Sequence, residues 1–123
     1  MVYEVTVEQT FSAAHHLRDY NGPCEHQHGH NFKVRVTIQG ERLNKAGMLV
    51  DFGDVKKAIR EVFAIVDHRD LNEIPPFDKE LNPTAENIAF YFHQKVTASL
   101  SSDVRVSEVT VWETEKQSAT YRP

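Results

Sequence analysis

Histidine stands out in this chain, because five of the seven histidines fall between His15 and His30. His28 and His30 share the alternation of the apolar residues that follow them from Phe32, so on a strand both imidazoles would lie on the apolar face. His15 has the same relation to the apolar positions of the first segment. Three neutral imidazoles with an open fourth position are typical of a catalytic zinc site. We therefore predict that His15, His28 and His30 bind one metal ion.

The other histidines leave alternatives open. His26 has the same parity as the predicted ligands and is an alternative to His15 as the third one. His16 has the opposite parity, so we expect it to point outward or to lie behind the ligands. His93 belongs to a predicted helix away from the cluster and is expected to be a surface or packing residue. An H-x-H pair alone also fits histidines that merely crowd a surface loop.

Cys24, the one cysteine, lies four residues before His28. A dication nearby would lower the pKa of its thiol below the free value of about 8.5. A zinc ligand, an inert buried thiol and a catalytic group remain open, and the complete histidine set favours catalysis. A cysteine base works with a histidine or an acid, and Asp67 followed by His68 is such a pair, although an Asp-His pair in a loop is often only polar surface.

Glu113 continues the parity of Val109 and Val111, so its carboxylate is expected on an apolar face near the end of a strand. A buried carboxylate needs hydrogen-bond donors. These donors are either a basic side chain or the N–H edge of a ligand, such as a guanidine-like group.

The predicted elements bring these residues together in one α+β domain that spans residues 1–123. Alternating apolar residues predict strands at residues 3–11 and 32–38, and a Val- and Thr-rich segment predicts another at residues 104–114, followed by a last short one at residues 118–122. Residues 48–50 are expected to be a short strand or a strand extension. Apolar residues at helical spacing predict one helix over roughly residues 53–66 and a second that begins after Thr84. We expect a four-stranded antiparallel sheet with both helices on one face.

Composition excludes several classes of protein. A net charge of −4 argues against general nucleic-acid binding, which needs a basic face. No apolar run approaches the roughly 20 residues of a membrane-spanning helix. The segment MVYEVTVEQ lacks the features of a secretory signal, and one cysteine excludes an internal disulfide framework, so we expect a cytoplasmic protein.

Several separated motifs occur in an order that is more specific than any one of them: residues 11–15 (FSAAH), Cys24-x-x-x-His28-Gly29-His30, residues 50–54 (VDFGD), Asp67-His68, residues 82–87 (NPTAEN) and Glu113-Thr114. Together they resemble the 6-pyruvoyl-tetrahydropterin synthase and 6-carboxy-tetrahydropterin synthase family over nearly the whole chain. The resemblance implies the tunnelling fold, in which trimers close a β-barrel and stack into a hexamer with active sites at subunit interfaces.

The resemblance also implies roles for individual residues. His15, His28 and His30 match the zinc ligands, and Glu113 matches the glutamate that anchors the pterin ring. The catalytic group is matched by Cys24, Asp67 and His68.

The implied substrate is 7,8-dihydroneopterin triphosphate. Three residues between Cys24 and His28 resemble the queuosine-pathway enzyme, which forms 6-carboxy-tetrahydropterin with release of acetaldehyde and triphosphate. A longer spacing between the cysteine and the first histidine would resemble the biopterin-forming animal enzymes, which eliminate triphosphate to give a 6-pyruvoyl product. The glutamate at position 25 resembles that of folate-pathway variants, which use a glutamate to cleave the side chain to 6-hydroxymethyl-dihydropterin. Alternatively, Glu25 is only a solvated acid in a loop.

Two hypotheses of other classes remain beside the enzyme. A histidine-rich metal-binding module for storage or sensing explains the clustered histidines but leaves Cys24, Asp67, His68 and Glu113 without a role. A tunnelling-fold relative without catalysis is the second. One zinc ion per chain together with turnover would support the enzyme.

Overall fold

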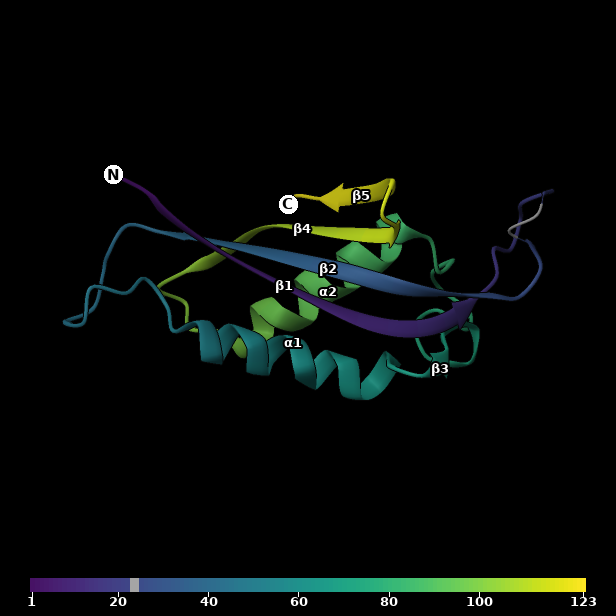
Figure 1. Ribbon diagram of the computed structural model, residues 1–123, viewed down its shortest axis with the longest axis horizontal. Helices are drawn as coiled ribbons and strands as arrows, with labels where there is room; N and C mark the ends of the chain where they lie inside the picture. The colour runs from purple at the N-terminus through teal and green to yellow at the C-terminus, as the bar shows by residue number, and fades with distance from the viewer. Residues whose placement is uncertain (23–24) are drawn as a thin grey trace.

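The computed structural model describes residues 1–22 and 25–123. The elements follow the chain in the order β1 (Tyr3–His15), β2 (His28–Gly40), α1 (Phe52–Val66), β3 (Arg69–Asp70), the short 3-10 helix η2 (Leu71–Glu73), α2 (Ala85–Ser99), β4 (Arg105–Thr114) and β5 (Gln117–Tyr121). The sheet forms one layer and both helices cover the same face of it (Figure 1). The predicted α+β class and the placement of the helices are confirmed.

The sheet has the strand order β3-β1-β2-β4-β5 and is antiparallel except where β3 runs parallel to β1. Two details differ from the prediction of four strands. Residues 48–50 are irregular, with bends at residues 49 and 50, and do not form a strand. Before them, the Asn44 side chain accepts hydrogen bonds from the backbone N–H groups of Ala46 and Met48 and closes a turn at residues 45–46. The fifth strand is β3, whose two residues pair with Ala13 and Ala14 at the edge of β1.

Both helices begin where the sequence provides a cap. The Asp51 carboxylate accepts from the backbone N–H of Gly53 at 2.7 Å, and the Thr84 hydroxyl accepts from that of Asn87 at 3.1 Å. Such caps satisfy N–H groups that have no partner within the helix. The apolar stripes that predicted the helices are buried against the sheet, at Val55, Ala58, Ile59, Val62 and Val66 of α1 and Ile88, Tyr91, Phe92 and Val96 of α2.

The core lies between the sheet and the two helices, and its aromatic centre leads directly to the histidines. Phe11 and Phe32 stack with ring centroids 5.1 Å apart, and Phe92 of α2 packs 5.5 Å from Phe11. The ring of His15 contacts Phe32 edge-on at 5.3 Å. Burial of each such phenylalanine contributes roughly 1.5–3 kcal/mol to the free energy of folding. The end of β1 that carries His15 is therefore stabilised by its packing against this aromatic group.

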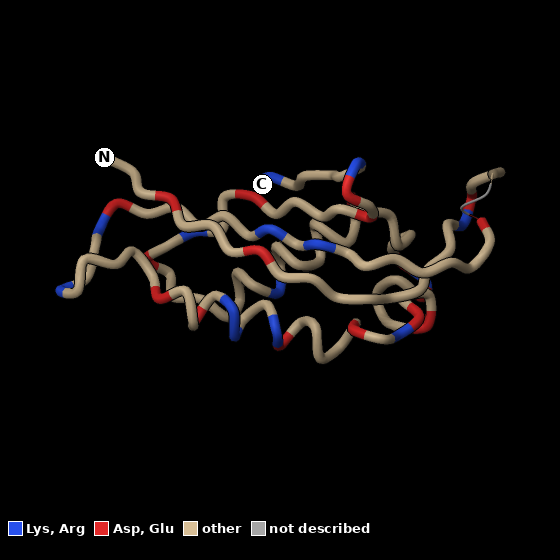
Figure 2. Tube along the Cα trace, in the orientation of Figure 1, with Lys and Arg blue, Asp and Glu red and all other residues tan. Residues whose placement is uncertain are grey.

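Charged residues of both signs are interspersed along the chain (Figure 2). On the sheet face opposite the helices they form ion pairs, with Arg35 at 2.7 Å from Glu8 and Arg122 at 2.6 Å from Glu108. Neither α1 nor α2 has the length and apolar composition that crossing a membrane requires, and no other described helix does.

Candidate metal centre and active site

The register of the two longest strands brings the three predicted metal ligands together. His15 pairs directly with His28 at the end of the β1–β2 ladder, and His30 pairs with Ala13 two residues further in. The ring centroids lie 4.5 Å apart for His15 and His28, 4.8 Å for His28 and His30, and 5.4 Å for His15 and His30. One potential ligand atom from each histidine and one from Glu113 all lie within 4.8 Å of one another, so this group could hold a metal ion.

The hydrogen bonds of the imidazoles leave nitrogen atoms free for a metal. Nδ1 of His15 lies 2.7 Å from the carbonyl oxygen of Pro83, and Nδ1 of His28 lies 2.7 Å from that of His26. A carbonyl only accepts, so each of these Nδ1 atoms donates and the lone pair is on Nε2. Nε2 of His15 and of His30 is buried without a hydrogen-bond partner. Such an orphaned atom costs about 1–3 kcal/mol, which a bound cation would offset.

Burial also keeps two of these rings in the form that binds a metal. It lowers the pKa of the imidazoles of His15 and His30, while the carboxylate of Glu113 acts in the opposite direction. Only a neutral imidazole can donate a lone pair to a metal ion. Both rings are therefore ready to bind at neutral pH.

Glu113 lies on β4 with a partner that the sequence analysis did not expect. Its carboxylate is 3.5 Å from Nε2 of His30, and its side chain is only 21% exposed. A register shift between Trp112 and Thr114 accompanies this position on the strand. The expected partners were a basic side chain or a ligand edge, whereas the structure places the carboxylate within the metal-binding group.

Asp67 and His68 form a pair that is anchored to β1. One carboxylate oxygen of Asp67 accepts from the backbone N–H of Ser12 at 2.9 Å and lies 3.0 Å from Nδ1 of His68. The N–H of Ser12, assisted by His68, lowers the pKa of Asp67. The backbone N–H of His68 donates to the carbonyl of Ser12, and its φ of 58° is uncommon for a residue other than glycine. With the backbone in this conformation, the His68 ring is 81% exposed.

A cavity of about 500 Å³ has both His30 and His68 in its lining. It is lined by residues of both groups, among them Ser12, Gly29, His30, His68 and Asp70. A substrate in this space could therefore contact His30 of the metal-binding group and His68 of the acid–base pair at the same time.

The remaining predicted residues lie outside this arrangement. Cys24 is not among the residues that the structure describes. Glu25 is exposed and lies 3.9 Å from the ring of His26, which is itself 81% exposed and does not join the metal-binding group. His16 makes its contacts with Asn72, and His93 is buried with Nε2 at 2.8 Å from the carbonyl of Val106, so it is a packing residue.

Several residues that support the site were missed by the sequence analysis. The carbonyl of Pro83 orients His15. The Asn82 side chain accepts from the backbone N–H of Arg18 at 2.9 Å and donates to its carbonyl at 2.8 Å, and the guanidinium of Arg18 donates to the carbonyls of Phe77 and Leu81. The sequence signal for these residues is the motif at residues 82–87, which carries the family resemblance but does not show that Asn82 and Pro83 contact the chain around His15.

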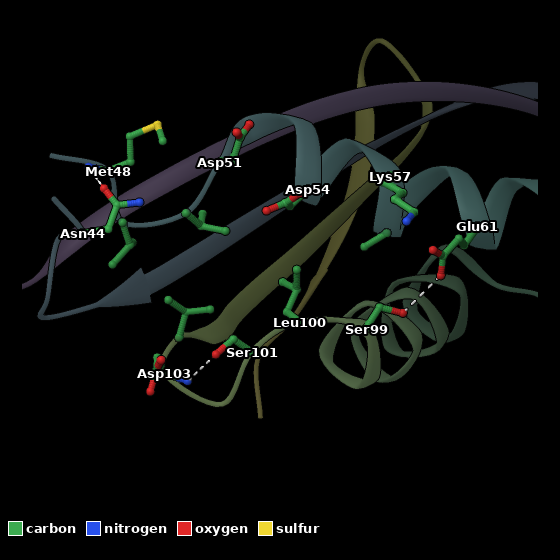
Figure 3. A pocket seen from close by; sticks show the side chains of 14 residues that line it. Asn44, Met48, Asp51, Asp54, Lys57, Glu61, Ser99, Leu100, Ser101 and Asp103 are labelled. Carbon is green, nitrogen blue, oxygen red and sulfur yellow. Dashed lines mark hydrogen bonds between the residues drawn. The ribbon is translucent and has the colours of Figure 1, made fainter. Parts of the chain in front are cut away.

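A second cavity, of about 540 Å³, lies at the opposite end of the sheet (Figure 3). Its polar side chains come from the segment before α1, from α1 itself, from the end of α2 and from the segment after it, and include Asn44, Asp51, Asp54, Glu61 and Asp103. Within residues 1–22 and 25–123, the histidine–glutamate group is the one cluster close enough to share a metal ion, so these acids do not form a second one.

Residues 4–123 match the family described as 6-pyruvoyl tetrahydropterin synthase. A 6-carboxy-5,6,7,8-tetrahydropterin synthase from Bacillus subtilis is 32% identical over 128 residues, covering 98% of this chain and 86% of the relative. A dihydroneopterin monophosphate aldolase from Pyrococcus furiosus is 34% identical over 113 residues, covering 92% and 91%. The structure of 6-pyruvoyl tetrahydropterin synthase from Caenorhabditis elegans superposes with a TM-score of 0.89 at 30% identity, covering 100% of this chain and 96% of the other.

Proposed function

This chain belongs to the 6-pyruvoyl tetrahydropterin synthase family, and from that premise we propose that it is a zinc-dependent lyase. The proposed reaction converts 7,8-dihydroneopterin triphosphate and water to 6-carboxy-5,6,7,8-tetrahydropterin, acetaldehyde and triphosphate. The observation that carries the proposal is the cluster of His15, His28 and His30, which has ring nitrogen atoms free to bind a metal, together with a cavity lined by both His30 and His68.

His15, His28 and His30 would hold the metal ion. Three imidazoles with an open position suit zinc better than magnesium or calcium, which prefer oxygen ligands. When bound, zinc supplies Lewis acidity that makes a proton on a neighbouring substrate hydroxyl easier to remove.

Two groups of the chain would move protons. Cys24 is the base that we assign to the side-chain carbon of the substrate, because its sequence position beside the metal ligands favours a thiolate. His68 is assigned to a second proton. When its Nδ1–H donates to Asp67, Nε2 is the ring atom that can accept a proton, and the carboxylate then stabilises the charged ring.

Glu113 would anchor the pterin by accepting hydrogen bonds from its N–H edge. Its position 3.5 Å from His30 would place the ring beside the metal ion, but the same position also suits a fourth metal ligand. Glu113→Gln separates the two roles. An anchor predicts unchanged metal affinity and a raised KM, whereas a ligand predicts a loss of metal affinity.

Side-chain cleavage to 6-hydroxymethyl-dihydropterin is the second candidate reaction, and elimination to a 6-pyruvoyl product is a further one. The cleavage is favoured by the presence of Glu25 and by the similarity to a dihydroneopterin monophosphate aldolase. A thiolate is a stronger base than a carboxylate at neutral pH, because a thiol is the weaker acid. We therefore assign the main reaction to Cys24 and any cleavage to Glu25.

The test is product analysis after incubation of the purified, zinc-loaded protein with 7,8-dihydroneopterin triphosphate. Cys24→Ala should lose the 6-carboxy product by about a hundredfold or more, within the range for general acid–base groups. Glu25→Ala should keep it and lose only 6-hydroxymethyl-dihydropterin. The assignment of the base is wrong if these two results are exchanged. Several weakly bound metal ions without any turnover would instead support a metal-binding module.

The edges of the sheet support assembly into a larger oligomer. Of the described residues of β1, only Ala13 and Ala14 pair with β3 on the outer side, and the edge of an antiparallel sheet tends to pair with another chain. We expect a cytoplasmic hexamer, built as a dimer of trimers, with active sites at subunit interfaces. A stable and active monomer in sedimentation at micromolar concentration would contradict this assembly.

A further inference from the structure

The last pair of the β1–β2 ladder is also the pair of metal ligands His15 and His28. The strands separate beyond it, and the terminal pair of a ladder frays unless other contacts hold it. The segment of residues 67–72, which begins with the Asp67–His68 pair, runs past this point and contacts the chain on both sides of it.

The first of these contacts holds the chain just after His15. The side-chain oxygen of Asn72 accepts from the backbone N–H of His16 at 2.9 Å, and its amide donates to the carbonyl of His16 at 3.1 Å. Both backbone groups of the residue that follows the ligand are therefore bound by one side chain.

The second contact holds the chain just before His28. One carboxylate oxygen of Asp70 accepts from the side-chain amide of Gln27 at 2.6 Å. The other oxygen accepts from the backbone N–H of Asn72 at 3.0 Å and caps η2. Asp70 therefore ties Gln27 to the same short segment that holds His16.

We propose that Asp70 and Asn72 are positioning residues, which hold the two ends of the loop between the metal-bearing strands against the segment that carries Asp67 and His68. This inference rests on the proposed metal site and adds to it the groups that set its geometry. Residues 67–70 also contact Ser12, Ala13 and Ala14 of β1, so this segment fixes the position of the Asp67–His68 pair relative to the histidines that would hold the metal ion.

Metal titration of the apo protein with Zn²⁺ and Co²⁺ tests the proposal without the substrate. Residues that orient ligands typically contribute 10- to 100-fold to metal affinity, and we expect about a tenfold loss in Asp70→Ala and in Gln27→Ala. The double variant should lose no more than Asp70→Ala alone, because the hydrogen bond from Gln27 to Asp70 is already absent in that variant. Asp70→Asn should recover most of the affinity. Its side-chain oxygen can still accept from the N–H of Asn72, and its NH2 can donate to Oε1 of Gln27 once the exposed Gln27 amide turns over.

Asp51→Ala is the matched control. Asp51 caps α1 by accepting from the N–H two residues ahead, as Asp70 does in η2, but it lies at the opposite end of the sheet. It should lower the melting temperature and leave the metal affinity and the visible spectrum of bound cobalt unchanged. Gln27→Ala keeps the test informative if Asp70→Ala does not fold, because Gln27 is an exposed side chain.

Two results would overturn the inference. One is a metal affinity within about twofold of the wild type in both Asp70→Ala and Gln27→Ala. The other is an equal loss in Asp51→Ala, which would make the effect one of general stability. A wild-type protein that binds neither Zn²⁺ nor Co²⁺ would contradict the proposed function itself. A wild-type protein that binds them while the variants bind equally well would contradict only the positioning role, so the two failures are distinguishable.

Discussion

The two ends of the sheet carry cavities of similar size, about 500 Å³ beside His30 and about 540 Å³ beside Asp51. They differ in whether the polar atoms around them have hydrogen-bond partners. At the Asp51 end, the carboxylate of Asp51 and the amide of Asn44 accept from backbone N–H groups close to them in sequence. At the His30 end, buried nitrogen atoms of His15 and His30 have no partner. Unsatisfied buried groups therefore distinguish the two ends, whereas cavity size does not.

The two ends also differ in how far apart in the sequence their contacts reach. Asn44 closes a local turn. Asn82, by contrast, forms hydrogen bonds with Arg18, 64 positions away, and the carbonyl of Pro83 forms one with the ring of His15, 68 positions away. A site assembled from distant segments depends on the whole fold, so substitutions there should affect both stability and metal binding.

The largest effect should follow the removal of a metal ligand. We expect His15→Ala and His30→Ala each to weaken zinc binding by at least about a hundredfold, since each removes one of three bonds from the ion to the protein. His16→Ala and Asp54→Ala, the latter in the opposite cavity, should bind zinc as the wild type does. Titration against a competing chelator measures the affinities. Full zinc retention in His15→Ala with loss in His26→Ala would show that His26 is the third ligand.

The two asparagines should differ in their effect on stability. Asn82→Ala removes two partly buried hydrogen bonds to the backbone of Arg18, and we expect a loss of about 1–2 kcal/mol in the free energy of unfolding. Asn44→Ala removes exposed, local hydrogen bonds and should cost about 0.5 kcal/mol or less. Urea denaturation of the metal-free protein measures both. Equal losses would contradict the difference drawn between the two ends.

The smallest effect should be the pH dependence at Asp67, for which Glu8 on the opposite face of the sheet is the comparison. The N–H of Ser12 lowers the pKa of Asp67, and the guanidinium of Arg35 lowers that of Glu8. A lowered pKa in the folded state means that the ionised group stabilises the fold above the unfolded pKa, near 3.8 for Asp67. That stabilisation is lost as the pH falls through the folded-state pKa.

We therefore expect Asp67→Asn and Glu8→Gln to lower the melting temperature slightly at pH 6 and to have no effect in strong acid. Salt should distinguish them, because the exposed Glu8–Arg35 pair is screened, whereas the chief partner of Asp67 is an uncharged N–H. Thermal unfolding at low and high salt checks this. An effect of Asp67→Asn that disappears in salt would contradict the assignment of Ser12 as its main partner.

Much of the fold could be predicted because the strands and helices follow local sequence patterns, namely apolar periodicity and helix capping. The apolar residues that alternate from Phe32 onward lie on the buried face of β2, and those at helical spacing from Val55 to Val66 lie on the buried face of α1. Asp51 and Thr84 cap the two helices at the positions where the sequence predicts that they begin. The predicted strand at residues 48–50 is wrong because a short apolar run is outweighed by the local hydrogen bonds of Asn44. Nothing in Arg69 and Asp70 indicates a strand, since two residues carry no periodicity.

The sequence by itself determined which imidazoles share a face, because parity along a strand follows from backbone geometry alone and relates His28 to His30. Only the tertiary structure decided what these rings meet. The pairing register brought His15 opposite His28, and the packing of β4 beside β2 brought Glu113 to His30. The return of the chain after α1 brought Asp67 to Ser12. These contacts join residues far apart along the chain, and local spacing carries no information about the packing that places distant segments together.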